Sequence, residues 1–397
     1  MMPKPIRTNK RKPTRPLWKG PVEDGISFSL LSKFLVCRER FRLKVVEGLD
    51  EDEGFNHNLE FGSLWHEAEE AHAAGKDWRP ALTRYKDKLR SRYPGDEDEI
   101  RKWFNVAKTT FPFYVRHWKK HKVETKRVPV LEEESFRVPL VLPSGRTITL
   151  RGKWDAVFRN GRSIYLQENK TKGRIDEAGL QGTVDQNLQT MIYRVALNVW
   201  MNLVKSGDIP PNLEPKPSKT ALKDVLNCTV KGTLYNVVRR PLSDLHCIKQ
   251  RKGREVWNKD KTRKVRKGAE TEKEFFERLA KDVIEPEAKS YFMRWKVLLT
   301  NKDVDRFRLH SLDPILEGLL DWWEWIAGDF NNPWRVPNAG ELVEGPLVRC
   351  PGGGVHHQAP WGVYNSMFGG FRGDFFEYLT TGRKTGLKTI KTLFPEL

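Results

Sequence analysis

The feature that most constrains the fold is a run of β-prone residues at positions 148–172, with Asn160-Gly161 near its centre. Asn-Gly is the strongest two-residue signal for a type I′ turn, because both of its residues tolerate positive φ. The segment is therefore predicted to form a β-hairpin. If Asn160 and Gly161 are the loop, Arg159 pairs with Arg162, and this register decides which way every other side chain of the hairpin points.

Three charged residues of this hairpin are predicted to converge. Counting outward from the turn places Asp155 opposite Leu166, and cross-strand partners share a face of the sheet. Side chains alternate with period two, so Glu168 and Lys170 lie on the face of Leu166 and hence of Asp155. The same register sets Lys153 opposite Glu168, so an exposed ion pair on a polar strand is the alternative interpretation.

Two carboxylates and an ammonium at one place suit metal-assisted hydrolysis of a phosphodiester. Carboxylate oxygens bind hard divalent cations such as Mg²⁺ and Mn²⁺, and the ion polarises the phosphate and lowers the pKa of a bound water. A nearby lysine orients or activates that water, or stabilises the charge on the phosphoryl oxygens. Charged residues on a solvated strand face are also ordinary, so further motifs have to decide.

The charge balance favours a polyanionic partner. The chain of 397 residues carries 71 Lys and Arg against 52 Asp and Glu, which gives a formal net charge of +19. Such a surface repels itself and is typical of proteins that bind nucleic acid, although a soluble protein can also be merely basic. Basic residues and prolines dominate the first 22 residues, which contain no acid, and this predicts a disordered basic arm over 1–25.

The four cysteines are widely scattered and include no C-x-x-C pair, which excludes a disulfide scaffold. No apolar run approaches the roughly 18 residues of a membrane span, and the N-terminus lacks a signal-peptide h-region. We therefore expect no membrane partner and a reducing, cytoplasmic compartment. A Walker pattern ending in Gly-Lys-Ser/Thr is absent, which argues against a nucleotide-driven motor.

Hydrophobic periodicity divides the chain into a helical first third, a β-rich middle and a helical last third. A helix is predicted to begin at Ser27 or Ser29, either of which can cap it, and Gly75 is the predicted stop of the next one. Together with the hairpin, the strand before it makes a three-strand antiparallel meander. The predicted helices span 27–48, 59–75, 78–122, 183–204 and 271–330, and the predicted strands span 128–142, 147–158 and 232–238.

A second basic segment, Lys249–Lys267, contains ten basic residues and two acidic ones. We expect residues 249–270 to form a mobile insertion that contacts phosphates without reading base sequence. The alternative is a flexible surface loop without a role, since runs of charged residues often face the solvent and bind no partner. The residues predicted to bind nucleic acid are Arg251, Lys252, Arg263, Lys264, Arg266 and Lys267.

Five short motifs in one order resemble the PD-(D/E)xK nuclease superfamily, specifically its RecB-like branch, which includes phage exonucleases and the CRISPR-associated RecB-family nucleases. Each motif alone is two or three common residues, but five in family order are hard to obtain by chance. The matching segments are Ser29–Phe41, Gly62–His66 (G-x-x-x-H), Gly152–Asp155 (G-x-x-D), Glu168–Lys170 (E-x-K) and Gln189–Tyr193 (Q-x-x-x-Y).

This resemblance implies an α/β fold, a restriction-endonuclease-like core with a mixed sheet and an antiparallel meander, flanked by N-terminal and C-terminal helical regions. It also implies a role for each matched residue. Lys170 lies beside the attacking water, Gln189 and Tyr193 support the substrate, and Glu134 in the preceding strand is a weaker addition. The implied metal ligands, for Mg²⁺ or Mn²⁺, are His66, Asp155, Glu168 and the carbonyl of Asn169.

The chain departs from many members of this branch, which bind an iron–sulfur cluster through one early and three late cysteines. Cys37 and Cys350 fit that pattern, but no cysteine follows Cys350, and Cys228 and Cys247 lie in the wrong region. We therefore do not expect an iron–sulfur cluster, and interpret these residues as buried or surface thiols.

The expected function is that of a metal-dependent DNA nuclease, specifically an exonuclease of phage-type replication, recombination or repair. Its partners would be DNA and a separate helicase or recombination protein, in the cytoplasm of the host cell. A structure-specific endonuclease and a catalytically inactive DNA-binding accessory protein are the alternatives. The expected regions are a basic arm (1–25), a helical region carrying His66 (26–125), the nuclease core (126–248), the basic insertion (249–270) and a C-terminal helical region with an irregular tail (271–397).

Overall fold

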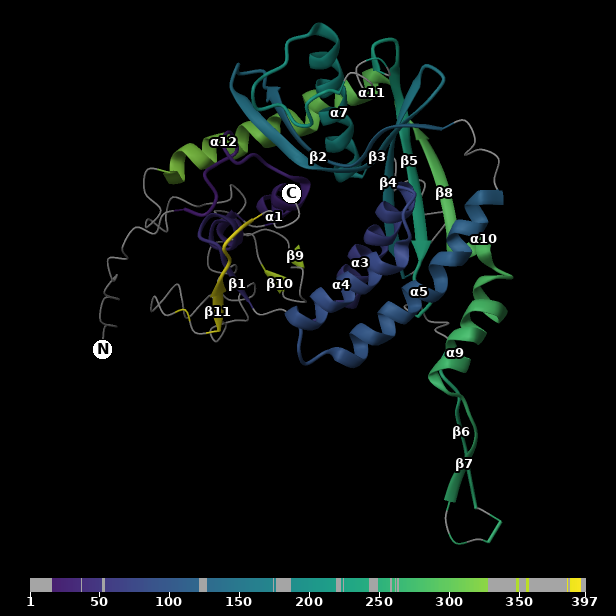
Figure 1. The fold of residues 1–397 in the computed structure, drawn as a ribbon. Helices are drawn as coiled ribbons and strands as arrows, with labels where there is room; N and C mark the ends of the chain where they lie inside the picture. Colours follow the sequence, from purple (N-terminus) through teal and green to yellow (C-terminus); the bar gives the residue numbers. More distant parts are fainter. Residues whose placement is uncertain are drawn as a thin grey trace, which may run out of the picture.

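A central mixed sheet with helices on both faces forms the body of the protein (Figure 1). This arrangement confirms the predicted α/β class. The computed structural model describes residues 16–36, 38–51, 54–120, 127–173, 175, 187–218, 223, 225–242, 249–257, 259–260, 262, 264–327, 348–349, 355–356, 384 and 386–393.

The sheet contains the strands β2 (Val128–Val141), β3 (Thr147–Asn160), β4 (Ser163–Lys172), β5 (Thr229–Arg239) and β8 (Phe292–Leu298). Their order is β2-β3-β4-β5-β8, and every neighbouring pair is antiparallel except β4 with β5. The predicted meander is therefore present as β2, β3 and β4. A parallel pair needs a crossover connection, and the helix α7 (Leu188–Ser206) lies between β4 and β5 in the chain.

The predicted hairpin is confirmed, but its turn lies one residue later than expected. Asn160 pairs with Ser163, so the loop is Gly161 and Arg162, and Gly161 has φ +62°. A left-handed conformation at this position suits glycine and is costly for residues with a Cβ. The predicted register, with Arg159 opposite Arg162, is thus wrong by two residues.

One face of the sheet is covered by α7 and by two helices from opposite ends of the chain, α1 (Phe28–Val36) and α12 (Asp313–Ala327). Aromatic and aliphatic side chains of β2, β3 and β4 contribute to this core. The side chain of Asn187 accepts from the Thr190 amide and so caps α7. The predicted helix over 183–204 is therefore present from residue 188, and residues 183–186 lie outside the described residues.

A helical layer packs against the other face, near β5 and β8. It consists of α3 (His57–Ala73), α4 (Trp78–Arg92) and α5 (Glu97–Lys120), and its core includes Val238 of β5 and Phe292 of β8. Gly75 follows α3 with φ +69°, as its predicted role as a stop requires. Two core clusters, one on each face, therefore hold the sheet.

Two predictions at the ends of the chain need correction. Residues 16–25 are not disordered, because Trp18 is fully buried against Phe41 and Trp323. Residues 1–15 of the predicted arm lie outside the described residues. The segment 271–330 is not helical throughout, because β8 lies inside it and forms an edge of the central sheet.

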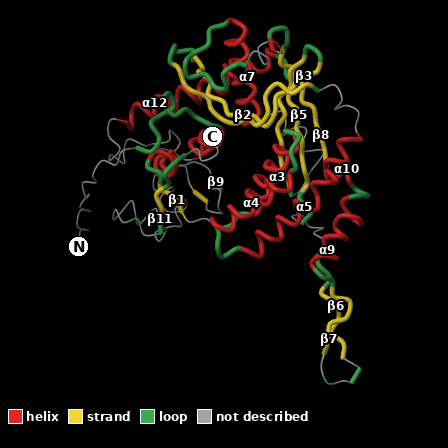
Figure 2. The backbone as a smooth tube through the Cα atoms, in the orientation of Figure 1, coloured by secondary structure: helices red, strands yellow, loops and turns green. Residues whose placement is uncertain are grey.

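The basic segment after β5 is a β-hairpin, not an irregular loop. Strands β6 (Lys252–Trp257) and β7 (Lys264–Ala269) pair with each other only and project away from the body of the protein (Figures 1 and 2). The described elements that follow are α9 (Glu272–Arg278), the π-helical η3 (Leu279–Ile284), α10 (Ala288–Tyr291), α11 (Asn301–Phe307) and the π-helical η4 (Arg308–Leu312).

Short elements complete the described part of the chain. A strand near the N-terminus, β1, pairs antiparallel with β11 near the C-terminus, and β9 pairs with β10. Among the described residues, no helix combines the length and the apolar character needed to cross a bilayer. These remaining elements are α2 (Arg38–Phe41), the π-helical η1 (Arg42–Val46), β1 (Leu49–Glu51), β9 (Val348–Arg349), β10 (Val355–His356) and β11 (Leu387–Thr389).

Candidate metal centre

Three acidic residues occupy neighbouring positions on three neighbouring strands. The register of β2 with β3 places Glu133 across from Asp155, and the register of β3 with β4, continued by one position, places Asp155 across from Glu168. Neighbouring carboxylates repel one another, so such a row is costly unless cations accompany it. The row therefore marks the place where a cation is expected.

The backbone is irregular at this row. Trp154 and Val157 both belong to the core beneath α7, although strict alternation would put them on opposite faces of β3. On the neighbouring strand, Glu133 has φ +49°, and no other described residue except glycines has a positive φ. A residue held in this region costs about 1–3 kcal/mol, and such strain clusters at functional sites.

Glu133, rather than Glu134, therefore belongs to the site. Both lie in a run of three glutamates, and β2 pairs Glu134 with Trp154, which is buried in the core beneath α7. Strand alternation alone cannot choose within such a run, because the left-handed turn of the backbone at Glu133 breaks the alternation. The sequence carries no signal for that turn.

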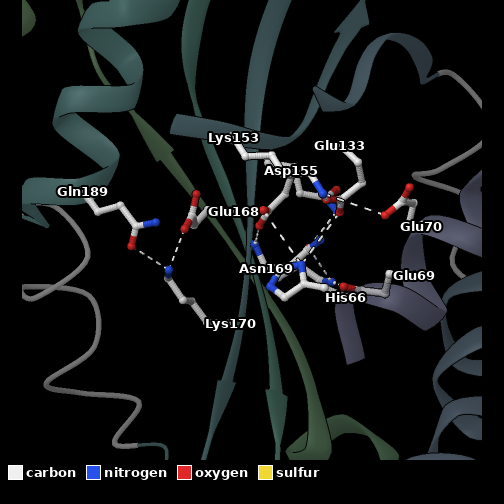
Figure 3. Close-up of polar contacts among 12 residues, drawn as sticks. His66, Glu69, Glu70, Glu133, Lys153, Asp155, Glu168, Asn169, Lys170 and Gln189 are labelled. Carbon is white, nitrogen blue, oxygen red and sulfur yellow. Dashed lines mark hydrogen bonds and ion pairs between the residues drawn. The ribbon is translucent and has the colours of Figure 1, made fainter. Parts of the chain in front are cut away.

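His66 on α3 completes a group that could hold a metal ion. One ligand atom from each of His66, Glu133 and Asp155 lies within 4.8 Å of the others. His66 Nδ1 is 3.8 Å from Glu133 Oε1 and 3.9 Å from Asp155 Oδ1, too long for hydrogen bonds. Ligands of an octahedral Mg²⁺ sit at about 2.1 Å from the ion and hence about 3–4 Å from one another. The spacing of these three residues fits such an ion (Figure 3).

The electrostatics of the group also fit a cation. Burial raises the pKa of Asp155 to about 7, with His66 opposing this rise and the charges of Glu168 and Glu133 adding to it. Burial opposes protonation of His66, but Asp155 and Glu133 outweigh it and raise the pKa of the imidazole to about 10. The carboxylates therefore favour a positive charge at this place, which a cation or a proton on His66 can supply. The Oε2 atom of Glu168 is buried and has no hydrogen-bond partner among the described residues.

Glu168, Lys170 and Gln189 form a second group beside the first (Figure 3). The ammonium Nζ of Lys170 lies 2.6 Å from Glu168 Oε1 and donates to Gln189 Oε1 at 2.7 Å. The two groups are linked by the backbone amide of Asn169, which donates to Asp155 Oδ2 at 2.6 Å. The amino group of Lys170 is thus held by one strand neighbour and by the first turn of α7.

Tyr193 lies one turn further along α7 than Gln189. Its side chain is 9% exposed, and burial and the charge of Glu168 raise the pKa of its hydroxyl, while Gln189 and the backbone of Lys153 oppose that rise. A Cβ on Gly152 would lie 2.8 Å from Phe136 and 3.0 Å from Tyr193, so only glycine lets the tyrosine pack this closely. The glycine of the G-x-x-D motif therefore has a packing role.

A buried polar network supports the site from behind. The side chain of Asn169 points away from the metal group, because its Oδ1 accepts from Gln167 at 2.9 Å and from Asn236 at 3.0 Å. Asn236 also donates to Glu69 at 3.0 Å and to Tyr114 at 2.7 Å. Burial raises the pKa of Glu69, and His66 opposes that rise. Asn236, Glu69 and Tyr114 belong to no motif and were not found from the sequence.

The predicted site residues thus lie in one region, although the register differs from the predicted one. Asp155 shares a group with His66 and Glu133, and Glu168, which the register places across from Asp155, lies with Lys170 beside that group (Figure 3). The alternative ion pair between Lys153 and Glu168 is not formed. Lys153 instead lies 2.8 Å from Glu133 and 3.8 Å from Glu70.

The predicted nucleic-acid contacts lie on the projecting β6–β7 hairpin. Arg251 and Lys252 are exposed near its base, the backbones of Lys264, Arg266 and Lys267 form part of β7, and Arg263 lies outside the described residues. Cys37 and Cys350, the two residues that fit a cluster ligand pattern, also lie outside the described residues. Cys228 is a buried free thiol.

The chain matches the model of a known protein family. The family described as the PD-(D/E)XK nuclease superfamily matches residues 25–294, which is more than half of the chain. The matched span begins before α1 and ends within β8, so it includes both groups of the site and every strand of the central sheet. No curated protein matches the chain.

Proposed function

The chain belongs to the PD-(D/E)XK nuclease superfamily, and on this premise we propose that it is a DNA exonuclease dependent on Mg²⁺ or Mn²⁺. The context we propose is phage-type replication, recombination or repair, with a separate helicase or recombination protein as partner. Nucleases of this superfamily use divalent metals, and the exonuclease assignment rests on the RecB-like order of the five motifs.

The residues that would hold the metal are His66, Glu133 and Asp155, with Glu168 and the Asn169 carbonyl at the adjoining positions. Nitrogen and carboxylate donors suit Mn²⁺ as well as Mg²⁺. When bound, the ion supplies a Lewis acid for the phosphate and lowers the pKa of a coordinated water. The raised pKa of His66 means that its imidazole has to lose a proton before it can coordinate the ion.

The ammonium group of Lys170 supplies a positive charge at a fixed position beside the metal-binding group. Two of the three N–H groups of its ammonium meet Glu168 and Gln189, and a water or a phosphoryl oxygen can accept from the third. A fixed ammonium stabilises the negative charge that develops on the phosphoryl oxygens, at no reorganisation cost during the reaction. Glu168 and Gln189 keep the flexible lysine side chain in that place.

The observation that carries the proposal is the position of the Lys170 ammonium. It is held beside a group of imidazole and carboxylate side chains that could bind a metal ion. A protein that kept the fold only for binding DNA would have no use for Lys170 held by both Glu168 and Gln189. Residues that act as one unit give losses of similar size when removed singly. Asp155→Asn, Glu168→Gln and Lys170→Ala should therefore each lower turnover by at least about 10³-fold while DNA binding persists.

The test is digestion of end-labelled linear DNA and closed circular DNA with Mg²⁺ or Mn²⁺, with and without a chelator. Lys172→Ala is the matched control for Lys170→Ala, because it removes an exposed lysine from the same strand. We expect linear DNA alone to be degraded, and only without the chelator. Cleavage of the closed circle would show that the protein is an endonuclease and not an exonuclease. Metal-dependent DNA binding without cleavage of either substrate would show that the protein has only an accessory role.

A further inference from the structure

The β6–β7 hairpin is the most basic projecting element that the structure describes. Among the described residues its two six-residue strands form a sheet of their own, and each reaches about 20 Å at roughly 3.4 Å per residue. The chain from 253 to 268 contains seven basic residues and two acidic ones. Arg254 and Lys259, whose side chains are described, are exposed. Two strands alone are marginally stable in water, so a projecting ribbon of this kind needs support at its base or from a partner.

An ion pair supports the base of the hairpin. Arg278 of α9 donates to both carboxylate oxygens of Glu270, at 2.6 Å from Nε and 2.8 Å from NH2. Glu270 also accepts from the backbone amide of Arg251, and its own amide donates to the Arg251 carbonyl. The carboxylate of Glu270 is only 7% exposed. Hydrogen bonds from Arg278 lower its pKa to about 2, so it is ionised throughout the physiological range.

The base is in turn fixed to the helical layer. Phe275 of α9 and Leu279 of η3 are buried, and Leu279 is part of the core with α3, α4 and α5. Glu272 of α9 accepts from Asn105 of α5 at 3.0 Å and lies 3.7 Å from Arg101. Arg278 therefore connects the hairpin to an element that cannot move without breaking the core. The direction in which the hairpin points is set by the folded body.

We infer that the β6–β7 hairpin is a ribbon mounted at a fixed angle that enters the major groove of duplex DNA, away from the site of cleavage. The inference rests on the proposed nuclease function, which makes DNA the polyanion. A major groove about 12 Å wide accepts a two-stranded β-ribbon. Arg254, Lys259 and the further basic residues of this segment would then contact phosphates, which fixes position without reading base sequence. The ion pair between Glu270 and Arg278 holds the hairpin relative to the body of the protein, and so sets the angle at which the hairpin approaches the DNA.

The first experiment removes the ribbon and keeps its base. Lys252 and Ala269 are paired, so replacing residues 253–268 by Asn-Gly closes the chain there with a two-residue turn. Binding is measured with a chelator, so that the result does not depend on hydrolysis. We expect affinity for a 40-base-pair duplex to fall about tenfold or more, and the salt slope to fall by up to about 6, at about 0.9 per phosphate contact. An unchanged thermal midpoint checks that the body is folded.

Two comparisons separate groove binding from charge alone. The loss should be smaller for single-stranded DNA of the same length, and an equal loss would overturn the groove assignment. Unchanged duplex affinity and salt slope would overturn the inference altogether and leave an acidic protein as the partner of the ribbon. Failure of the wild-type protein to cleave any DNA would contradict the proposed nuclease function instead. The binding measurements would still test the role of the ribbon, because they do not depend on cleavage.

The second experiment tests the fixed angle. Glu270→Ala makes the protein more positive by one charge, so charge alone predicts equal or tighter DNA binding. If Arg278 and Glu270 set the angle, duplex affinity should fall by about threefold or more. Glu277→Ala is the matched control, because it removes an exposed acid from α9, the helix that carries Arg278, where Glu277 lies 4.0 Å from Lys273. Equal affinities of the two variants would overturn the role of the ion pair.

Discussion

Replacing Asn236 by leucine should reveal how much the fold depends on the buried network behind the metal group. Asn236 is fully buried on β5, in the middle of the sheet. Leucine has the same branching at Cγ but neither donates nor accepts a hydrogen bond. The substitution therefore removes the polar contacts, and its bulkier methyl groups add to the packing at this site.

The loss can be worked out from the contacts. The amide nitrogen of Asn236 lies within 3.0 Å of acceptors on Glu69, Tyr114 and Asn169, and its two N–H groups can serve two of them at a time. Its oxygen accepts from Arg294 at 3.1 Å. Each of the three lost hydrogen bonds is worth about 1 kcal/mol, and a buried partner left without a hydrogen bond costs about 1–3 kcal/mol more. Burial of the apolar leucine side chain offsets about 1 kcal/mol of this loss. The free energy of unfolding should fall by about 3–5 kcal/mol.

The assay is urea denaturation of the two proteins with a matched control on the same strand. Thr233 is also fully buried, but its hydroxyl has no partner among the described residues. Thr233→Val should therefore leave the free energy of unfolding unchanged or raise it, because it deletes an unsatisfied hydroxyl. A loss below about 1 kcal/mol for Asn236→Leu, or equal losses for both variants, would refute the reasoning.

Three further predictions concern the site. Lys170→Ala should abolish hydrolysis while Lys172→Ala leaves it near the wild-type rate, and comparable losses in both would remove Lys170 from the chemistry. Glu133→Gln should raise the Mn²⁺ concentration needed for half-maximal activity while Glu134→Gln does not, and a titration with equal midpoints would return Glu133 to a structural role. The pKa of His66 is about 10 in the absence of metal, so Mn²⁺ must displace its proton, and Mn²⁺ affinity should rise with pH, by up to about tenfold per unit between pH 7 and 9. Mn²⁺ affinity that stays flat from pH 7 to 9 would remove His66 from the ligands.

The fold class followed from local patterns because each pattern has a local cause. Asn160-Gly161 marked a hairpin, since few residue pairs allow so tight a turn, and alternation marked the neighbouring strand. The exact loop did not follow, because Gly161 with either neighbour can form a two-residue turn. The edge strand β8 was missed, since the chain around it has helical periodicity and only pairing with β5 makes it a strand.

The site was predicted through motif order, and the structure explains why periodicity alone was insufficient. His66 precedes Asp155 by about ninety residues, and only the packing of α3 against the sheet brings the two together. Glu133 could not be chosen from three consecutive glutamates, because a left-handed residue inside a strand leaves no trace in residue type. The face argument for Asp155 started from the wrong turn register, but a shift of two residues keeps the parity of the pairing, so Asp155 lies across from Glu168 instead of Leu166.

The sequence by itself determined what depends on neighbouring residues: the hairpin, the helix caps and stops, the net positive charge and the spacing of the E-x-K and Q-x-x-x-Y motifs. The tertiary structure alone decided what depends on residues far apart in the chain. It made Asn236 a junction between α3, α5 and β4, and it turned a basic segment into a ribbon fixed through Glu270 and Arg278. Burial supplies the physical reason, because a polar group withdrawn from water must find a partner, and only the folded chain determines which partner is within reach.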